Sequence, residues 1–195
     1  MDVLPALLAF AFASSVTPGP NVIMVAASAA NHGVRATLPH MLGITFGFPA
    51  MIVLVGLGLA GPFAMSPTLH LVLKWIGSAW LLWLAWKIAR AGAPGEGTGK
   101  PPLGFLGAAA FQWVNPKAWM LALAAIPAFS RPGGDVLADT LMIAAAFLAV
   151  SLPALAVWAV VGRGAAYLLD SPARLRAFNV TMALLLVASI VLVFI

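Results

Sequence analysis

One stretch restricts the fold of this chain more than any other: Thr17–Asn21 (Thr-Pro-Gly-Pro-Asn), inside an apolar run over Val3–Ala30. Its two prolines have no backbone N–H, so the helical hydrogen bonds break there and the carbonyls of Ser14 and Val16 lose their usual donors. The flanks are long and apolar enough to cross a bilayer. Irregular backbone is tolerated at that depth only where protein buries it or it lines a watery cavity. The break is therefore a candidate binding site.

Composition supports a membrane location. Of the 195 residues, 63% are hydrophobic and only 8% are charged, against about 25% charged residues in soluble domains. The net charge of +5 comes from a few basic residues between apolar runs, which favours a topology signal over a nucleic-acid site. With no cysteine, disulfides, thiolate metal sites and thiol redox chemistry are excluded, and we expect no cofactor or metal. The start of the chain lacks the basic region of a cleavable signal peptide, so the first segment should remain a helix.

Six apolar segments are long enough to span a membrane, each with about 20 residues or more. They are Val3–Ala30, Thr37–Phe63, Leu69–Ala91, Leu103–Phe129, Val136–Leu169 and Phe178–Ile195. Residues 92–102 are rich in glycine and proline and are typical of a flexible linker. We expect one transmembrane domain over 1–195, with halves 1–91 and 103–195 joined by this cytoplasmic linker.

Three segments per half imply that two repeated halves would be inverted in the membrane. Pro18 lies near the middle of the first segment and Pro116 near the middle of the fourth. Interrupted helices at corresponding positions of two halves point to a transporter's binding site. The predicted fold is an all-α integral membrane protein of six transmembrane helices, arranged as two inverted three-helix repeats with broken first and fourth helices.

Basic residues predict the orientation, because cytoplasmic loops carry an excess of Lys and Arg. With both termini outside, two basic residues, Lys74 and Arg131, face the exterior, and Lys117 belongs to neither side. The seven that then face the cytoplasm are Arg35, Lys87, Arg90, Lys100, Arg163, Arg174 and Arg176.

The second break predicts an anion site. Asn115 is a favoured N-cap and Pro116 suits the first helical position, so a half-helix should start in midmembrane with free N–H groups and a positive dipole end. Lys117 follows, at a cost of about 2.5–3.5 kcal/mol for a central lysine. Of the acidic residues, only Asp139 could reach inward. We infer that a ligand carboxylate is the partner of Lys117; the alternative is a water-filled crevice without a specific role.

The first break should add donors and acceptors at the same place. A half-helix starting at Pro20, capped by Thr17 or Gly19, offers N–H groups, while the freed carbonyls and that of Gln112 accept hydrogen bonds. Donors beside acceptors suit a zwitterion, and the lack of a buried carboxylate favours a neutral amino acid; a packing kink is the alternative. The predicted substrate-binding residues are Thr17, Pro18, Gly19, Pro20, Asn21, Gln112, Asn115, Pro116 and Lys117.

Other features of the segments are less specific. His40 could titrate as a proton carrier, although a structural or interfacial role is the alternative. Gly43 and Gly47 form a small-xxx-small pattern that is typical of close helix packing.

The two proline motifs resemble the LysE/RhtB amino-acid exporter family, as do Asn31-His32-Gly33, the stretch from Leu73-Lys74-Trp75 to Lys87, and Gln112. The resemblance covers nearly the whole chain. The stretch at Trp83–Ala89 looks most like the family's cysteine/O-acetylserine exporter branch. The resemblance implies six segments in the bacterial inner (plasma) membrane and export of amino acids from the cytoplasm, driven by proton motive force. Many members have a histidine where this chain has Met51; if that histidine carries protons in those members, coupling here needs another group, for which His40 and Asp139 are the candidates. The sixth segment also lacks the family's glycine near Ala183.

The leading hypothesis is a secondary transporter, and not an enzyme, that exports small neutral amino acids such as cysteine, O-acetylserine, homoserine or threonine. Its expected partners are the amino acid and the bilayer, with a homodimer as a further option. A membrane enzyme is disfavoured, since the segments carry neither HExxH nor GxSxG. An accessory or structural subunit has little reason to keep an unpaired midmembrane lysine.

Overall fold

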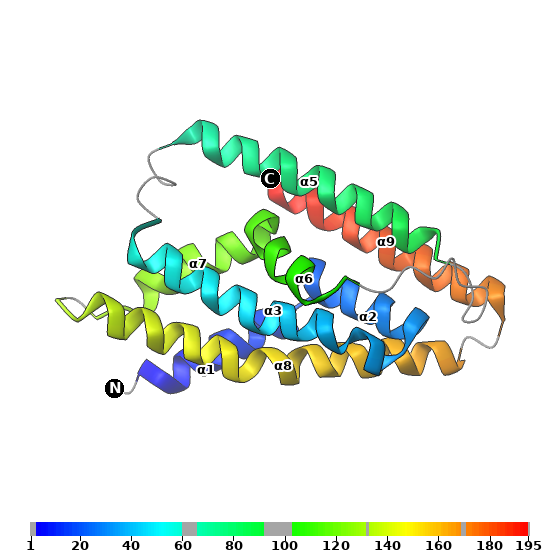
Figure 1. The fold of residues 1–195 in the computed structure, drawn as a ribbon, viewed down its shortest axis with the longest axis horizontal. Coiled ribbons are helices and arrows are strands. Elements are labelled where there is room, and N and C mark those ends of the chain that lie inside the picture. The colour runs from blue at the N-terminus through cyan, green and yellow to red at the C-terminus, as the bar shows by residue number, and fades with distance from the viewer. Residues whose placement is uncertain (1–2, 60–65, 92–102, 132, 169–170, 195) are drawn as a thin grey trace.

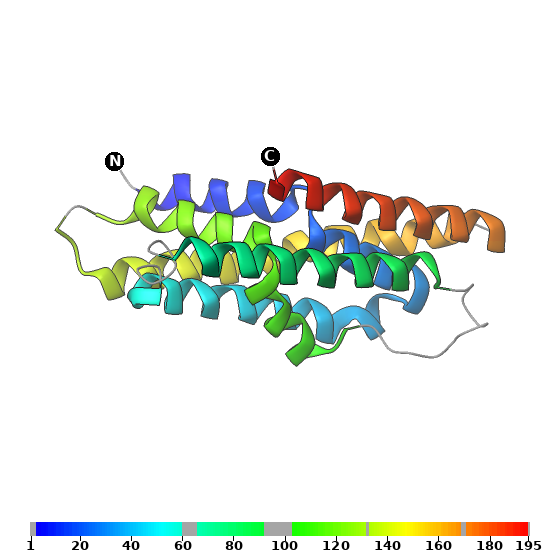
Figure 2. The ribbon, with the colours of Figure 1, turned by 90° about the horizontal axis from the view of Figure 1, so that it is seen from above.

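The computed structural model describes residues 3–59, 66–91, 103–131, 133–168 and 171–194. Every element within these ranges is helical, and most of the helices run along the long axis of the molecule (Figures 1 and 2). The elements are α1 (Val3–Val16), α2 (Pro20–His32), α3 (Val34–Leu54), η1 (Val55–Leu59), α5 (Pro67–Ala89), α6 (Phe105–Phe111), η2 (Gln112–Val114), α7 (Pro116–Phe129), α8 (Val136–Leu168) and α9 (Pro172–Phe194). The linker predicted over 92–102 lies outside the described residues.

The first predicted break is confirmed. Helix α1 ends at Val16, α2 begins at Pro20, and the two are bent by 53° relative to each other. Gly19 is the N-cap of α2, in extended backbone that any residue can adopt. The break therefore follows from the missing N–H groups of the two prolines, and does not need a conformation restricted to glycine.

The second break is also where the sequence places it. A 3-10 turn, η2, ends α6, and α7 begins at Pro116 after Asn115 in extended conformation. The side-chain oxygen of Asn115 accepts a hydrogen bond from the backbone N–H of Lys117 at 3.2 Å. The predicted N-cap is confirmed.

The number of spans is smaller than six when each helix is taken by itself. Among the described residues, four stretches are long and apolar enough to cross a membrane, and the bent pair α1–α2 gives a fifth. The four stretches are Val34–Gly58, Leu71–Ala89, Val136–Leu168 and Pro172–Val191. The predicted fourth segment is divided at its break into Phe105–Val114 and Pro116–Phe129, neither of which reaches the length of a span.

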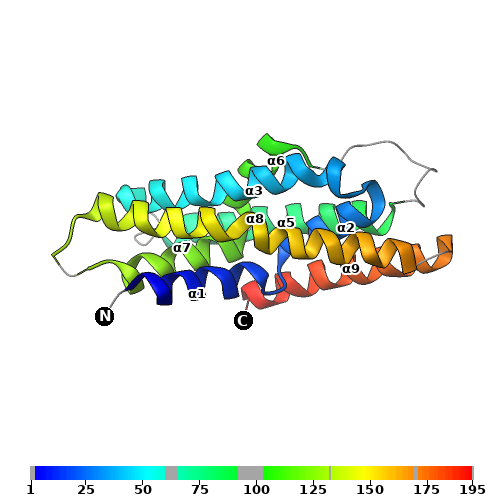
Figure 3. The same ribbon diagram turned by 90° about the horizontal axis from the view of Figure 1, so that it is seen from below.

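Helix α8 lies at the centre of the packing. It contacts α1, α2 and α3, while α5 and α9 lie side by side at the edge of the bundle (Figures 1 and 3). The largest apolar cluster brings together buried side chains of α1, α3, α7 and α8 around Phe147, which is fully buried. Met51, the position noted for its departure from the family pattern, is fully buried in this cluster.

Small residues allow the helices to approach closely. A Cβ added at Gly43 would stand 2.3 Å from the carbonyl oxygen of Phe105, and one at Gly47 would stand 2.6 Å from Ala109 Cα. The predicted packing role of this pair is thus confirmed, and its partner is α6. The contact brings the short helix α6, and with it the second break, against α3.

The ends of the bundle differ in charge. One end is formed by the α2–α3 junction, the last turns of α5 and α8, and the first turn of α9; the other contains the start of α5 and the α7–α8 junction (Figure 1). The first end carries Arg35, Lys87, Arg90, Arg163, Arg174 and Arg176, and the second carries Lys74 and Arg131. Apart from Lys117, the described basic residues thus lie at the two ends, six at the first and two at the second.

Candidate functional site

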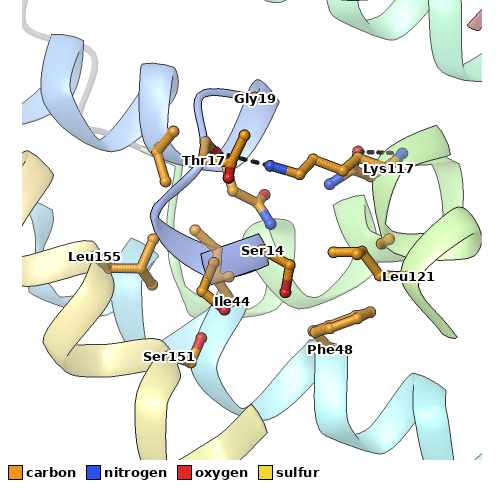
Figure 4. A pocket seen from close by; sticks show the side chains of 14 residues that line it. Ser14, Thr17, Gly19, Ile44, Phe48, Lys117, Leu121, Ser151 and Leu155 are labelled. Carbon is orange, nitrogen blue, oxygen red and sulfur yellow. Dashed lines mark hydrogen bonds between the residues drawn. The ribbon is translucent and has the colours of Figure 1, made fainter. Parts of the chain in front are cut away.

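The two breaks meet in space, as the sequence predicts. The Lys117 ammonium donates a hydrogen bond to the carbonyl oxygen of Thr17 at 2.7 Å, and that of Pro18 lies 3.5 Å from it (Figure 4). Both acceptors are free of helical hydrogen bonds because the chain bends between Val16 and Pro20. Two sites 100 residues apart therefore form a single polar cluster.

This contact corrects the inference that Lys117 has no structural partner. The partner is the broken backbone of the first segment, and not a carboxylate. Of the acidic side chains that the structure describes, Asp135 caps α8 through the N–H groups of Leu137 and Ala138, and Asp139 binds Arg131. Carbonyl dipoles stabilise an ammonium without neutralising it, so the positive charge of Lys117 remains at the junction.

Gly19 makes room for the lysine side chain. A Cβ added there would stand 2.8 Å from Lys117 Cδ and 3.1 Å from its Nζ. Since the backbone of Gly19 is extended, its value at this position is space and not conformational freedom. The absence of a side chain at Gly19 in the first break thus leaves room for the side chain of Lys117 from the second break.

A pair of amides also joins the two breaks. Asn21 Nδ2 donates to Gln112 Oε1 at 2.8 Å, and Gln112 Nε2 donates to Asn21 Oδ1 at 3.2 Å and to the carbonyl of Ala108 at 2.9 Å. Gln112 is completely buried. The two bonds between Asn21 and Gln112 join the start of α2 to the end of α6, and the bond to Ala108 holds the Gln112 side chain against its own helix.

The two helix N-termini differ in their free donors. At α7, Pro116 has no N–H, and the N–H groups of Lys117 and Ala118 bond to the side chain and carbonyl of Asn115. The predicted anion site on free N–H groups is therefore wrong for α7. At α2, by contrast, Gly19 provides no side-chain cap, so the N–H groups of Asn21 and Val22 have no helical partner.

The predicted carbonyl acceptors are only partly available. The Val16 carbonyl accepts a hydrogen bond from the Trp158 indole at 2.9 Å, and that of Gln112 accepts one from the Asn115 N–H at 3.3 Å. No hydrogen bond to the Ser14 carbonyl occurs within the described parts of the chain. The acceptors that face Lys117 are instead those of Thr17 and Pro18.

A cavity of about 40 Å³ opens beside this junction (Figure 4). It is lined by Ser14, Ser15, Thr17, Gly19, Asn21, Val22, Ile44, Phe48, Asn115, Lys117, Ala118, Leu121, Ser151 and Leu155. One water occupies roughly 10–15 Å³ of such space, so the cavity holds about three waters. Its polar side comes from the breaks, and its opposite side from apolar residues of α3, α7 and α8.

The structure thus brings five predicted residues to the cavity wall: Thr17, Gly19, Asn21, Asn115 and Lys117. Pro18, Pro20, Gln112 and Pro116 shape the junction without lining the cavity. The sequence argument considered the carbonyl of Ser14, but it missed Ser15 and Ser151 and the hydroxyl of Ser14 as parts of the cavity wall. A polar residue in the apolar sequence of α8 was the available signal for Ser151, but the sequence alone does not show which way it faces.

The two candidate proton carriers lie away from the cavity. His40 is 1% exposed, and neither ring nitrogen has a hydrogen-bond partner among the described residues. Asp139 is also 1% exposed, and its carboxylate binds the Arg131 guanidinium at 2.7 Å and the Arg131 backbone N–H at 2.8 Å. That pair fixes the connection between α7 and α8.

Comparison with known proteins places the chain among membrane translocators. The cysteine/O-acetylserine efflux protein of Salmonella choleraesuis (strain SC-B67) is 30% identical over 195 residues, which cover 98% of this chain and 97% of the relative. The protein of the same name from Escherichia coli (strain K12) is 29% identical over 193 residues, with the same coverage. No solved structure matches. The model of one family, the LysE type translocators, matches residues 12–194, and the chain therefore belongs to that family.

Proposed function

We propose that this protein is a secondary transporter that exports small neutral amino acids from the cytoplasm across the bacterial inner membrane. The observation that carries the proposal is the meeting of two helix breaks at one cavity, where the Lys117 ammonium faces the carbonyls of Thr17 and Pro18. Relatives named for cysteine and O-acetylserine efflux support a substrate of this class.

The junction offers complementary groups to both charges of an amino acid. The substrate carboxylate binds the Lys117 ammonium and the uncapped N–H groups of Asn21 and Val22, where the α2 dipole adds positive potential. The substrate ammonium takes the carbonyls of Thr17 and Pro18. It is the same kind of donor as Lys117, which binds these carbonyls in the structure. Substrate binding is then an exchange of partners, in which Lys117 turns from the carbonyls to the carboxylate.

The size of the cavity supports a small substrate. With a volume of about 40 Å³, the cavity must widen even for an amino acid of seven or so non-hydrogen atoms, and far more for an aromatic one. Movement of the half-helices at the breaks provides the widening, as expected of a site at which two repeats alternate their access.

The packing supports two inverted repeats. Helix α3 contacts α8 and α5 contacts α9, so the second and third helices of one half each contact their counterpart in the other half. Helices α1 and α2 contact α8, while α6 contacts α3. Both members of the central pair contain a proline within a continuous helix, Pro49 in α3 and Pro153 in α8. If each broken pair crosses the membrane as one unit, there are six spans.

The charge difference between the two ends supports an orientation with both termini outside. The end that carries Arg35, Lys87 and Arg90 then faces the cytoplasm, in agreement with the positive-inside rule. Large apolar side chains on α5 and α9, such as Trp75 and Leu184, are exposed and would contact lipid or a second copy of the chain in a homodimer.

Of the two candidate proton carriers, we assign coupling to His40. Neither ring nitrogen has a hydrogen-bond partner among the described residues, so the nitrogen that carries no hydrogen is available to accept a proton. Asp139 has a different role, because Arg131 already occupies both of its oxygens. A His40→Gln variant should therefore export down a substrate gradient, but should no longer concentrate substrate against one when only a pH gradient is applied.

The test is transport by the purified chain in lipid vesicles. Wild-type protein should move O-acetylserine, cysteine and homoserine, faster with a pH gradient than without one. Lys117→Met should lower the rate about 10–100-fold, the effect of losing a hydrogen bond to a charged group. Lys87→Met is the matched control, since Lys87 lies over the Trp83 ring, outside the cavity.

Two results would contradict the proposal. If vesicles containing folded wild-type protein moved no amino acid, the alternative of an accessory or structural subunit would be favoured. If Lys117→Met and Lys87→Met both transported at the wild-type rate, the protein could still be an exporter, but its carboxylate site would not be at Lys117.

A further inference from the structure

We propose that Ser151 determines which side chains this site accepts, by hydrogen bonding to a thiol, hydroxyl or ester oxygen on the substrate. The inference rests on the proposed function, because it assigns the part of the cavity that faces the substrate side chain. It names a substrate class: short amino acids with a hydrogen-bonding group near the β-carbon, in preference to aliphatic ones of the same size.

The hydroxyl of Ser151 has no hydrogen-bond partner among the described residues, although most of the residue is buried. Its residue lies in the interior of α8, two positions before Pro153, and only 5% of its surface is exposed. Helical serines usually bond back to the carbonyl four residues earlier, but Ser151 makes no hydrogen bond within the described parts of the chain. Because Ser151 lines the cavity, its hydroxyl is open to hydrogen bonding with water or with a polar group of a ligand in the cavity.

The hydroxyl points into the cavity, on the side opposite Lys117 (Figure 4). Around it the wall is apolar and consists of Ile44, Phe48, Leu121 and Leu155. An amino acid whose carboxylate binds Lys117 therefore extends its side chain toward this apolar wall, where Ser151 offers a hydroxyl for hydrogen bonding.

The other lining serines are less suited to this role. The hydroxyl of Ser14 donates to the Ala11 carbonyl at 3.1 Å, so its proton is already used within α1. Ser15 is only partly buried. Ser151 alone among the three combines deep burial with an uncommitted donor and acceptor, and it can therefore bond to either a hydroxyl or an ester oxygen.

The prediction is a difference in selectivity. Serine and 2-aminobutyrate differ by the replacement of a hydroxyl by a methyl group, so the ratio of their transport rates isolates the hydrogen bond. We expect wild-type protein in lipid vesicles to prefer serine about tenfold, the effect of one buried hydrogen bond. Ser151→Ala should lower this ratio to about one, whereas Ser151→Thr, which retains the hydroxyl, should keep most of it.

Ser14→Ala is the matched control, and it should change the ratio far less because the Ser14 hydroxyl is already bonded within its helix. Elution of each variant from a size-exclusion column establishes that it is folded. An unchanged ratio in folded Ser151→Ala would overturn this inference and leave the proposed function intact. A wild-type protein that transports neither of these two amino acids, nor O-acetylserine, cysteine or homoserine, would overturn both.

Discussion

The amide pair Asn21–Gln112 provides a test of the junction that does not depend on any ligand. Replacing Gln112 by leucine removes both reciprocal bonds and the bond to the Ala108 carbonyl. It also leaves the half-buried Asn21 amide without its partner. Stranding a polar group in this way costs about 1–3 kcal/mol, so Gln112→Leu should lower the free energy of unfolding by that amount. Asn21→Leu should have a similar effect.

The double variant, with Asn21→Leu and Gln112→Leu combined, tests whether the two side chains contact each other. Hydrogen bonds between membrane helices contribute about 0.6 kcal/mol on average and about 1.7 at most. Two reciprocal bonds at 2.8 and 3.2 Å therefore predict a coupling energy of about 1–2 kcal/mol. Once one amide has been removed, removing the other should cost little more, and the double variant should be only slightly less stable than either single one.

The assay is equilibrium unfolding of the purified protein by SDS titration in mixed micelles, followed by circular dichroism. A control cycle combines Asn21→Leu with Thr181→Val, whose hydroxyl bonds only within its own helix, to the Ala177 carbonyl. Because Asn21 and Thr181 share no hydrogen-bond partner, their effects should add. If the effects at Asn21 and Gln112 also added, these side chains would not meet, and the reasoning that brings the two breaks together would be refuted.

Two further perturbations address the packing and the ion pair. Gly162→Ala places a Cβ 2.1 Å from the Ala26 carbonyl oxygen and should lower the midpoint of thermal unfolding by several degrees, because backbone atoms cannot move aside as a side chain can. Gly164→Ala is the control and should leave the midpoint unchanged, because nothing lies within 4 Å of the added Cβ. Equal effects of the two variants would contradict the α2–α8 contact. Arg131→Met leaves the Asp139 carboxylate buried with a single backbone donor and should cost about 1–3 kcal/mol in the SDS titration. Arg131→Lys should recover part of this loss. A wild-type midpoint for Arg131→Met would show that the ion pair does not stabilise the fold.

The positions of the breaks could be predicted because they depend on local chemistry. Pro18, Pro20 and Pro116 remove hydrogen-bond donors wherever they occur in a helix, and Asn115 is a favoured cap beside any helix start. The structure begins α2 and α7 at the expected prolines. The meeting of the two breaks followed from the same observation, combined with the expectation that transporters place such breaks together.

The partner of Lys117 could not be predicted in the same way. A lysine in an apolar segment suggests a search for a carboxylate, but the bend of the first segment frees backbone carbonyls at Thr17 and Pro18, which no sequence pattern marks as acceptors. The prediction of free N–H groups at the start of α7 was wrong for a related reason. Asn115 was correctly predicted to cap α7, and that cap uses the donors that the anion site would need.

The residues on the apolar side of the cavity also could not be predicted from the sequence. Helix α8 is apolar on all faces, so its periodicity does not reveal its rotation, and Ser151 could have faced lipid, protein or cavity. The lengths of α6 and α7 had a similar limit, since an apolar run of 27 residues in the sequence, Leu103–Phe129, does not show how a break divides it.

The central claim is that Lys117 receives the carboxylate of a bound amino acid. Solid-state NMR can measure this contact as the dipolar coupling between lysine labelled with 15N at Nζ and O-acetylserine labelled with 13C in its carboxylate, with Lys117→Met to identify the signal. We predict a coupling that corresponds to an N···O separation within about 4 Å. We also predict loss of the 2.7 Å hydrogen bond from Lys117 to the Thr17 carbonyl. A bound substrate whose carboxylate shows no coupling to Lys117, while the lysine stays on the Thr17 carbonyl, would contradict the account.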